Sequence, residues 1–73
     1  MQARIAYDVD RIREDMALRG WMKRDLARVA GVAPMTVTNF MTGHSQTAKT
    51  AHKLALALGY TVRRYLISNR KVA

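Results

Sequence analysis

The chain has 73 residues, enough for one small domain, and it contains no cysteine, so a fold held by disulfides is excluded. Its formal net charge is +8, from 13 lysines and arginines against 5 acids, and every acid lies in the first 25 residues. From Leu26 onward the chain carries bases and no acid, an imbalance that favours a polyanionic partner.

Two helices are predicted before residue 31. The apolar residues Ile5, Val9, Ile12 and Met16 recur at helical spacing, which predicts a helix over 5–19 that ends at Gly20. Its charged residues are expected mostly toward solvent: Asp8, Asp10, Arg11, Arg13, Glu14 and Asp15. Residues 23–30 predict a shorter helix whose inward side chains are Leu26, Ala27 and Ala30. Trp21 is expected to pack over the corner between these two helices.

Three further helices are predicted, and no segment alternates in the manner of a strand. Pro34 suits the first position of a third helix, which buries Val37, Phe40 and Met41. Thr47 is the expected N-cap of a fourth helix over about 47–58, with an inward stripe of Ala51, Leu54, Ala55 and Leu58. A fifth helix is expected after Thr61, a second cap candidate, with Val62, Tyr65 and Leu66 inward. We expect one domain over 1–73, with a core at about 5–67 and a polar, basic tail over 68–73 of the composition found in disordered termini.

The segment from Asp25 to Gly43 has the pattern of a helix-turn-helix. Ala27 is small enough to let two helices cross closely, and Gly31 permits the positive φ that reverses the chain. Val32 is expected to anchor the turn in the core, and Val37 to anchor the second helix. The outward positions of that helix carry no charge, as suits a surface that contacts base edges in a major groove: Pro34, Met35, Thr36, Thr38 and Asn39.

This segment resembles the helix-turn-helix of the phage repressor and Cro-type (XRE) family, and it is also similar to the lactose-repressor type. The matching residues are Leu26, Ala27, Ala30, Gly31, Val32, Thr36, Val37, Thr38 and Gly43. Residues 49–60 resemble the following helix, so the likeness covers roughly 11–66. A full helix precedes the motif, as in the phage repressor family, which we therefore favour. The resemblance implies an all-α, five-helix, lambda-repressor-like DNA-binding domain and a cytoplasmic regulator of bacterial or phage origin.

The resemblance also implies roles for individual residues. Asn39 is the best candidate base reader, because its amide can bond adenine N6 and N7 together. Met35 is expected against a thymine methyl group. The full set of expected DNA-binding residues is Lys23, Pro34, Met35, Thr36, Thr38, Asn39, Thr42, His44, Ser45 and Lys49. Gln46, Arg63, Arg64, Arg70 and Lys71 are further candidates for phosphate contacts.

Several positions depart from the family pattern. Lys23 replaces the Gln that often braces a phosphate, and Pro34 replaces a Gln that often reads adenine. Met16 and Met41 replace a frequent Arg–Glu pair, which fits an apolar contact in its place. Ala33 stands where a capping Ser is usual, so we expect a weaker cap on the third helix.

Chemistry other than DNA binding finds little support in the sequence. No nucleophile–base–orienter set occurs, so an enzyme is not expected. The two histidines, His44 and His52, have no nearby carboxylate, so no metal or other cofactor is expected. No apolar run approaches the ~20 residues of a membrane span, and residues 1–4 do not open a signal peptide. No small-molecule effector is expected.

The leading interpretation is a homodimer on a palindromic operator, with the recognition helix at 34–42. Candidate residues for the dimer surface are Tyr65, Leu66, Ile67 and Val72. Two alternatives remain open: a protein-interaction module, such as an antitoxin bound to a toxin, and a basic RNA-binding domain.

Overall fold

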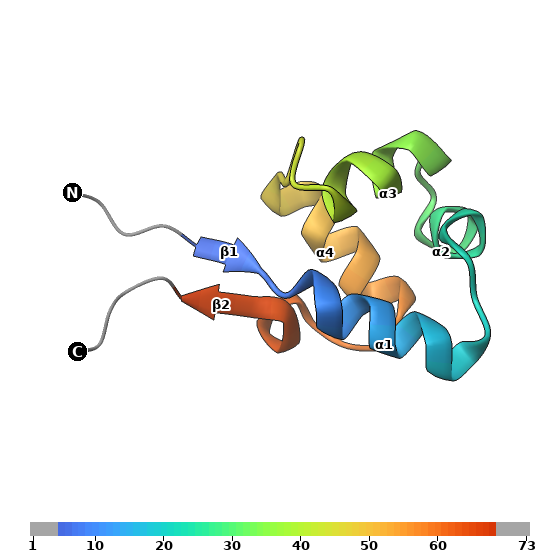
Figure 1. The fold of residues 1–73 in the computed structure, drawn as a ribbon, viewed down its shortest axis with the longest axis horizontal. Helices are drawn as coiled ribbons and strands as arrows, with labels where there is room; N and C mark the ends of the chain where they lie inside the picture. The colour runs from blue at the N-terminus through green and yellow to red at the C-terminus, as the bar shows by residue number, and fades with distance from the viewer. Residues whose placement is uncertain (1–4, 69–73) are drawn as a thin grey trace.

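The computed structural model describes residues 5–68 (Figure 1). The elements in chain order are β1 (Ile5–Tyr7), α1 (Val9–Arg19), α2 (Lys23–Ala30), α3 (Pro34–Met41), α4 (Ala48–Ala57), the 3-10 helix η1 (Val62–Tyr65) and β2 (Leu66–Ser68). Within this described range, four α-helices and one 3-10 helix replace the five helices predicted from the sequence. Among residues 5–68, no helix is both long enough and apolar enough to cross a membrane.

The three helices from α2 to α4 confirm the predicted pattern. α2 has the predicted bounds, and α3 begins at Pro34 with no side-chain cap from Ala33. α4 begins after Thr47, whose hydroxyl oxygen accepts a hydrogen bond from the Thr50 amide at 3.2 Å. These boundaries are set by local chemistry, which is why the sequence predicts them.

The N-terminal prediction is wrong for residues 5–7, which form a strand and not the first turn of a helix. Asp8 is the N-cap of α1, because its carboxylate accepts a hydrogen bond from the Arg11 amide at 3.0 Å. The helix therefore starts at Val9. The preceding residues pair antiparallel with the other end of the described chain, with Ile5 opposite Ser68 and Tyr7 opposite Leu66. The Tyr7 ring lies 5.3 Å from the Phe40 ring of α3, between centroids, so this ribbon of two strands also contacts the third helix.

The prediction of a fifth helix after Thr61 is also wrong. Only Val62–Tyr65 is helical, as a 3-10 turn, and the Thr61 side chain makes no capping bond. Leu66, expected inward, is 40% exposed and opens β2. The chain extends here because β1 supplies backbone partners, and the Asp8 amide donates to the Tyr65 carbonyl at 2.7 Å. Of the predicted tail, Ser68 belongs to β2, and residues 69–73 lie outside the described residues.

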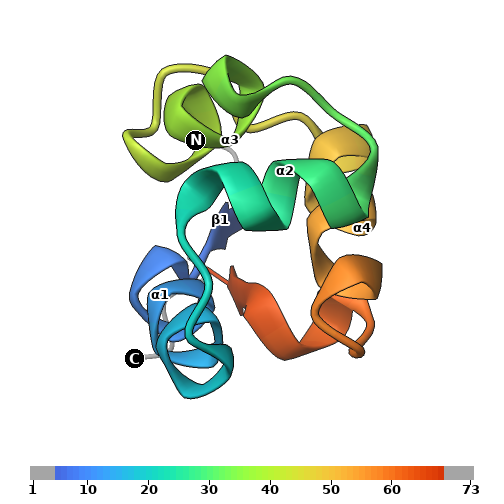
Figure 2. The same ribbon diagram turned by 90° about the vertical axis from the view of Figure 1, so that its right-hand side faces the viewer.

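One hydrophobic core joins all four helices and η1. Its buried members are Ile12, Met16, Leu26, Ala27, Val37, Phe40, Met41, Ala51, Leu54, Ala55, Leu58 and Tyr65. Most of the predicted inward positions are among them, and Val9, Ala30, Val32 and Val62, also predicted inward, pack half-buried against this core. Met16 and Met41 are both 6% exposed, so apolar side chains fill the positions of the family's frequent ion pair. Figures 1 and 2 show α3 on the opposite side of the fold from α1 and η1.

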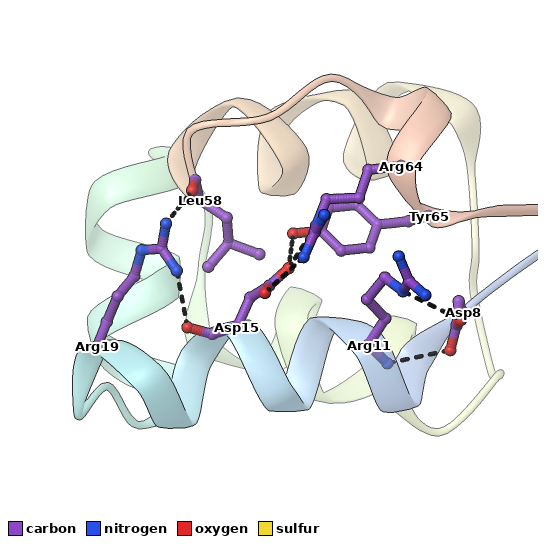
Figure 3. Close-up of polar contacts among 7 residues, drawn as sticks. All are labelled: Asp8, Arg11, Asp15, Arg19, Leu58, Arg64 and Tyr65. Carbon is purple, nitrogen blue, oxygen red and sulfur yellow. Dashed lines mark hydrogen bonds and ion pairs between the residues drawn. The ribbon is translucent and has the colours of Figure 1, made fainter.

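Asp15 is buried, contrary to the prediction that the charged residues of α1 mostly face solvent. It is 1% exposed, and its carboxylate accepts hydrogen bonds from Arg64 Nε at 2.9 Å and Nη2 at 3.1 Å, and from the Tyr65 hydroxyl (Figure 3). The hydrogen bonds from Arg64 lower the pKa of Asp15 below its ordinary value, although burial acts in the opposite direction. This cluster of three residues fastens α1 to η1.

Arg19 makes a second connection between α1 and the C-terminal half of the chain. Its guanidinium donates to the Asp15 carbonyl at 2.9 Å and to the Leu58 carbonyl at 2.5 Å (Figure 3). It also lies 5.9 Å from the Trp21 ring centroid and 5.8 Å from that of Tyr60. Trp21 is half-buried against the core at the corner between α1 and α2, as predicted.

Candidate nucleic-acid interface

The turn between α2 and α3 spans only residues 31–33. Gly31 has φ +76°, a left-handed conformation that residues with a Cβ rarely adopt. The amides of Gly31 and Val32 donate to the last carbonyls of α2, those of Arg28 at 3.3 Å and Ala27 at 3.0 Å. This arrangement is a Schellman motif, which ends α2 and turns the chain directly into α3. The predicted helix-turn-helix is therefore present.

The outer face of α3 is uncharged. Val37, Phe40 and Met41 are buried, so the helical period places Met35 and Asn39 on the opposite side of the helix. Met35 is 63% exposed, Pro34 is exposed, and Asn39 is half-buried, as are Thr36 and Thr38. The side chains predicted to face a groove are thus all at least partly accessible on one short helix.

The loop after α3 is held against the end of that helix. The amides of His44 and Ser45 both donate to the Asn39 carbonyl, at 2.8 and 3.2 Å, and Gly43, at φ +83°, donates to Phe40 O at 3.2 Å. The Gln46 side-chain amide also donates to the Phe40 carbonyl, at 2.9 Å. These bonds fix His44 and Ser45, which are exposed, relative to α3.

Two residues in this region have structural roles that the sequence does not reveal. The Thr42 hydroxyl donates to the Thr38 carbonyl at 3.0 Å, so while that bond holds it has no hydrogen for a phosphate oxygen. Gln46 commits one amide hydrogen to the loop bond with Phe40. A contact between either side chain and a phosphate, as predicted, would therefore compete with these internal bonds.

The first turn of α2 presents two exposed cations, Lys23 and Arg24. The Met22 amide donates to the Asp25 carboxylate at 2.8 Å, which lowers the pKa of Asp25, and Arg28 pairs with the same carboxylate at 3.3 Å. The Asp25 carboxylate therefore has its partners within α2 and the residue before it, and it does not pair with Lys23 or Arg24. Arg24 was missed in the sequence analysis, although its position beside Lys23 in the first turn of α2 is a usable signal.

The ion pairs show which cations remain available. Arg11, Arg13, Arg28 and Arg64 are each paired with an aspartate. Within residues 5–68, six cationic side chains form no ion pair. Arg19 is one of them, but its guanidinium donates to two backbone carbonyls. The other five are Lys23, Arg24, Lys49, Lys53 and Arg63. Figures 1 and 2 place the loop 42–47 and the first turn of α4, which carries Lys49, on the same side of the fold as α3.

The predicted phosphate role of Arg64 is not supported, because its guanidinium is bound to Asp15 and lies 4.0 Å from the Tyr60 ring centroid. Arg63 lies on η1, on the side of the fold opposite α3 (Figures 1 and 2). Arg70 and Lys71 lie outside the described residues. Among residues 5–68, no three histidine, aspartate or glutamate side chains are grouped as metal ligands would be.

A comparison with protein-family models finds a helix-turn-helix family that matches residues 12–64. No curated protein and no solved structure gives a match. The family match covers most of the chain and includes α2, the turn, α3 and α4, the elements that carry the described surface. The chain therefore belongs to the phage repressor and Cro-type (XRE) helix-turn-helix family.

Proposed function

We propose that the protein is a sequence-specific, double-stranded DNA-binding regulator of transcription that places α3 in the major groove. Its family consists of helix-turn-helix DNA-binding domains, typically without catalytic activity, which implies DNA binding and transcriptional regulation. One observation carries the finer proposal: the outer face of α3 is uncharged, whereas α2 and α4, which pack against α3, carry exposed cations with no acidic partner among residues 5–68, namely Lys23, Arg24 and Lys49. A surface of this kind suits base edges in a groove with phosphates on either side.

The proposed base contacts come from α3. Asn39 reads an adenine with its amide, and Met35 contacts a thymine methyl group, because both lie on the side of the helix away from Val37. Thr36 and Thr38 supply short polar groups beside them. Pro34 approaches the groove without donating a hydrogen bond.

The proposed phosphate contacts come from the elements around α3. Lys23 and Arg24 lie in the first turn of α2, and Lys49 lies in the first turn of α4, where backbone amides also favour an anion. His44 and Ser45 stand on the fixed loop between α3 and α4. Thr42 contributes less to phosphate binding, because its hydroxyl hydrogen is donated to the Thr38 carbonyl. These contacts set the register of the protein on the duplex without reading sequence.

We further propose that two copies bind a palindromic operator, since a few base contacts from one short helix give weak binding and a second half-site multiplies the affinity. Leu66 and Ile67 are 40% and 44% exposed and remain candidates for contact between the copies. Tyr65 is 2% exposed, so it is not a candidate for that contact, and Val72 lies outside the described residues.

Selection of bound duplexes from a random pool tests the proposal directly. We expect enrichment of one motif and a footprint with two-fold symmetry. A footprint over one isolated half-site would contradict the dimer. A pull-down is compared with a gel-shift assay at low salt. If the protein retains a stoichiometric acidic partner protein and shifts no duplex, the protein-interaction alternative is favoured instead.

A further inference from the structure

We infer that the base pairs beneath α3 are predominantly A·T. This inference rests on the proposed function and specifies the class of DNA sequence that the same surface would select. It follows from which side chains α3 exposes and which hydrogen-bonding and apolar groups each base pair shows in the major groove.

A guanine-reading side chain is missing from α3. Guanine presents two acceptors in the major groove, N7 and O6, which arginine or lysine binds with paired donors. Residues 34–41 contain neither arginine nor lysine, and all eight of these residues are described. The threonines offer single hydroxyls, which do not discriminate strongly between bases.

The groups that α3 does expose suit adenine and thymine. The amide of Asn39 offers one donor and one acceptor together, which matches the N7 acceptor and N6 donor of adenine. Met35 is 63% exposed and presents an apolar thioether, for which the thymine C5-methyl is the apolar feature of the groove. Met35 precedes Asn39 by four residues, so the two are neighbours on one helix face and address adjacent base pairs.

The surrounding cations do not change this assignment for the central base pairs. Lys23 and Arg24 belong to α2, and Lys49 belongs to α4, so each lies beside the recognition helix and not on it. Their charges address the phosphates that border the groove. The inferred A·T preference therefore applies to the base pairs that face Met35 and Asn39.

Modified bases test this inference in the duplex enriched from the random pool. Replacing thymine by uracil removes only the C5-methyl, and we expect binding of the wild-type protein to weaken about 3- to 5-fold at the contacted position. Replacing adenine by 7-deazaadenine removes the N7 acceptor, with an expected loss of about 5-fold or more. Replacing guanine by 7-deazaguanine beneath α3 should change nothing.

Variants connect each modified base to a residue. Met35→Ala should abolish sensitivity to uracil, and Asn39→Ala should abolish sensitivity to 7-deazaadenine. Leu18→Ala is the matched control, because Leu18 is 82% exposed on α1, on the opposite side of the fold, and it should keep both sensitivities. Thermal unfolding of each variant confirms that the fold is retained.

The outcomes separate this inference from the proposed function. Enrichment of G·C pairs beneath α3, or weakened binding to the 7-deazaguanine duplex, would overturn the A·T preference and leave sequence-specific binding intact. Sensitivities that persist in Met35→Ala and Asn39→Ala would also overturn it. Failure to enrich any motif would overturn the proposed function itself.

Discussion

Substituting Arg64 with methionine should destabilise the protein by a large fraction of its total stability. The change removes both guanidinium bonds to Asp15, which is 1% exposed and would keep only the Tyr65 hydroxyl as a polar partner. Removing one partner of a buried ion pair costs about 3–5 kcal/mol. The Arg64 side chain is itself 32% exposed, so entering water offsets part of this loss, and we expect about 2–3 kcal/mol.

Urea denaturation at pH 7, followed by the fluorescence of the lone Trp21 and by far-ultraviolet circular dichroism, measures this change. The whole domain is expected to have only about 4–10 kcal/mol of unfolding free energy, so the denaturation midpoint should fall clearly while the slope m stays constant. Arg63→Met is the matched control: Arg63 is exposed, forms no ion pair within residues 5–68, and should cost less than about 0.5 kcal/mol.

The double variant Asp15→Leu with Arg64→Met distinguishes the pair from its surroundings. Apolar replacement of both partners is often neutral, so the double variant should be more stable than Arg64→Met alone. Equal urea midpoints for Arg64→Met and Arg63→Met would show that the buried Asp15 carboxylate does not depend on Arg64, contrary to this prediction.

Four further predictions concern acid stability, base reading, phosphate contact and the turn. Asp15 has a lowered pKa when folded, so it adds stability above its ordinary pKa of about 3.9 that is lost as pH falls toward the folded value; Asp15→Asn should remove this part of the acid-side slope in urea titrations from about pH 5 to 3. Asn39→Ala should relax sequence preference but leave non-specific binding nearly unchanged in competition assays, and an unchanged preference would refute its reading role. Lys23→Ala should weaken binding to all duplexes and reduce the log–log salt slope by about 0.9, whereas an unaltered slope would exclude a phosphate contact. Gly31→Ala should cost about 1–2 kcal/mol in thermal unfolding, because φ is +76° although no atom lies within 4 Å of the added Cβ; an unchanged midpoint would show that the turn relaxes.

The helices were predictable where local chemistry sets them. Pro34 and Gly31 mark the start of α3 and the end of α2, and the apolar stripes identify the buried faces. The strands were not predictable, because three residues are too few to show alternation and Ile5–Tyr7 finds its partners in Leu66–Ser68 at the other end of the described chain.

Asp15 illustrates why buried charges escape sequence analysis. It lies three residues after Ile12 and beside Met16, so the helical period does place it toward the core. A carboxylate there is acceptable only with a partner, and Arg64 reaches it through the tertiary fold, from η1. The exposed candidates on α3 were identifiable as outward positions, whereas the internal bonds of Thr42 and Gln46 depend on the loop conformation.

The β1–β2 ribbon has a kinetic consequence for α3. Its strands join segments separated by nearly the whole described chain, so closing that long loop precedes their pairing, and the ribbon is expected to form late and open early. Each opening would withdraw the Tyr7 ring from Phe40, which packs behind the groove-facing side of α3. Local unfolding of β1 and β2 would therefore loosen the packing of the buried face of α3 well before the helices themselves separate.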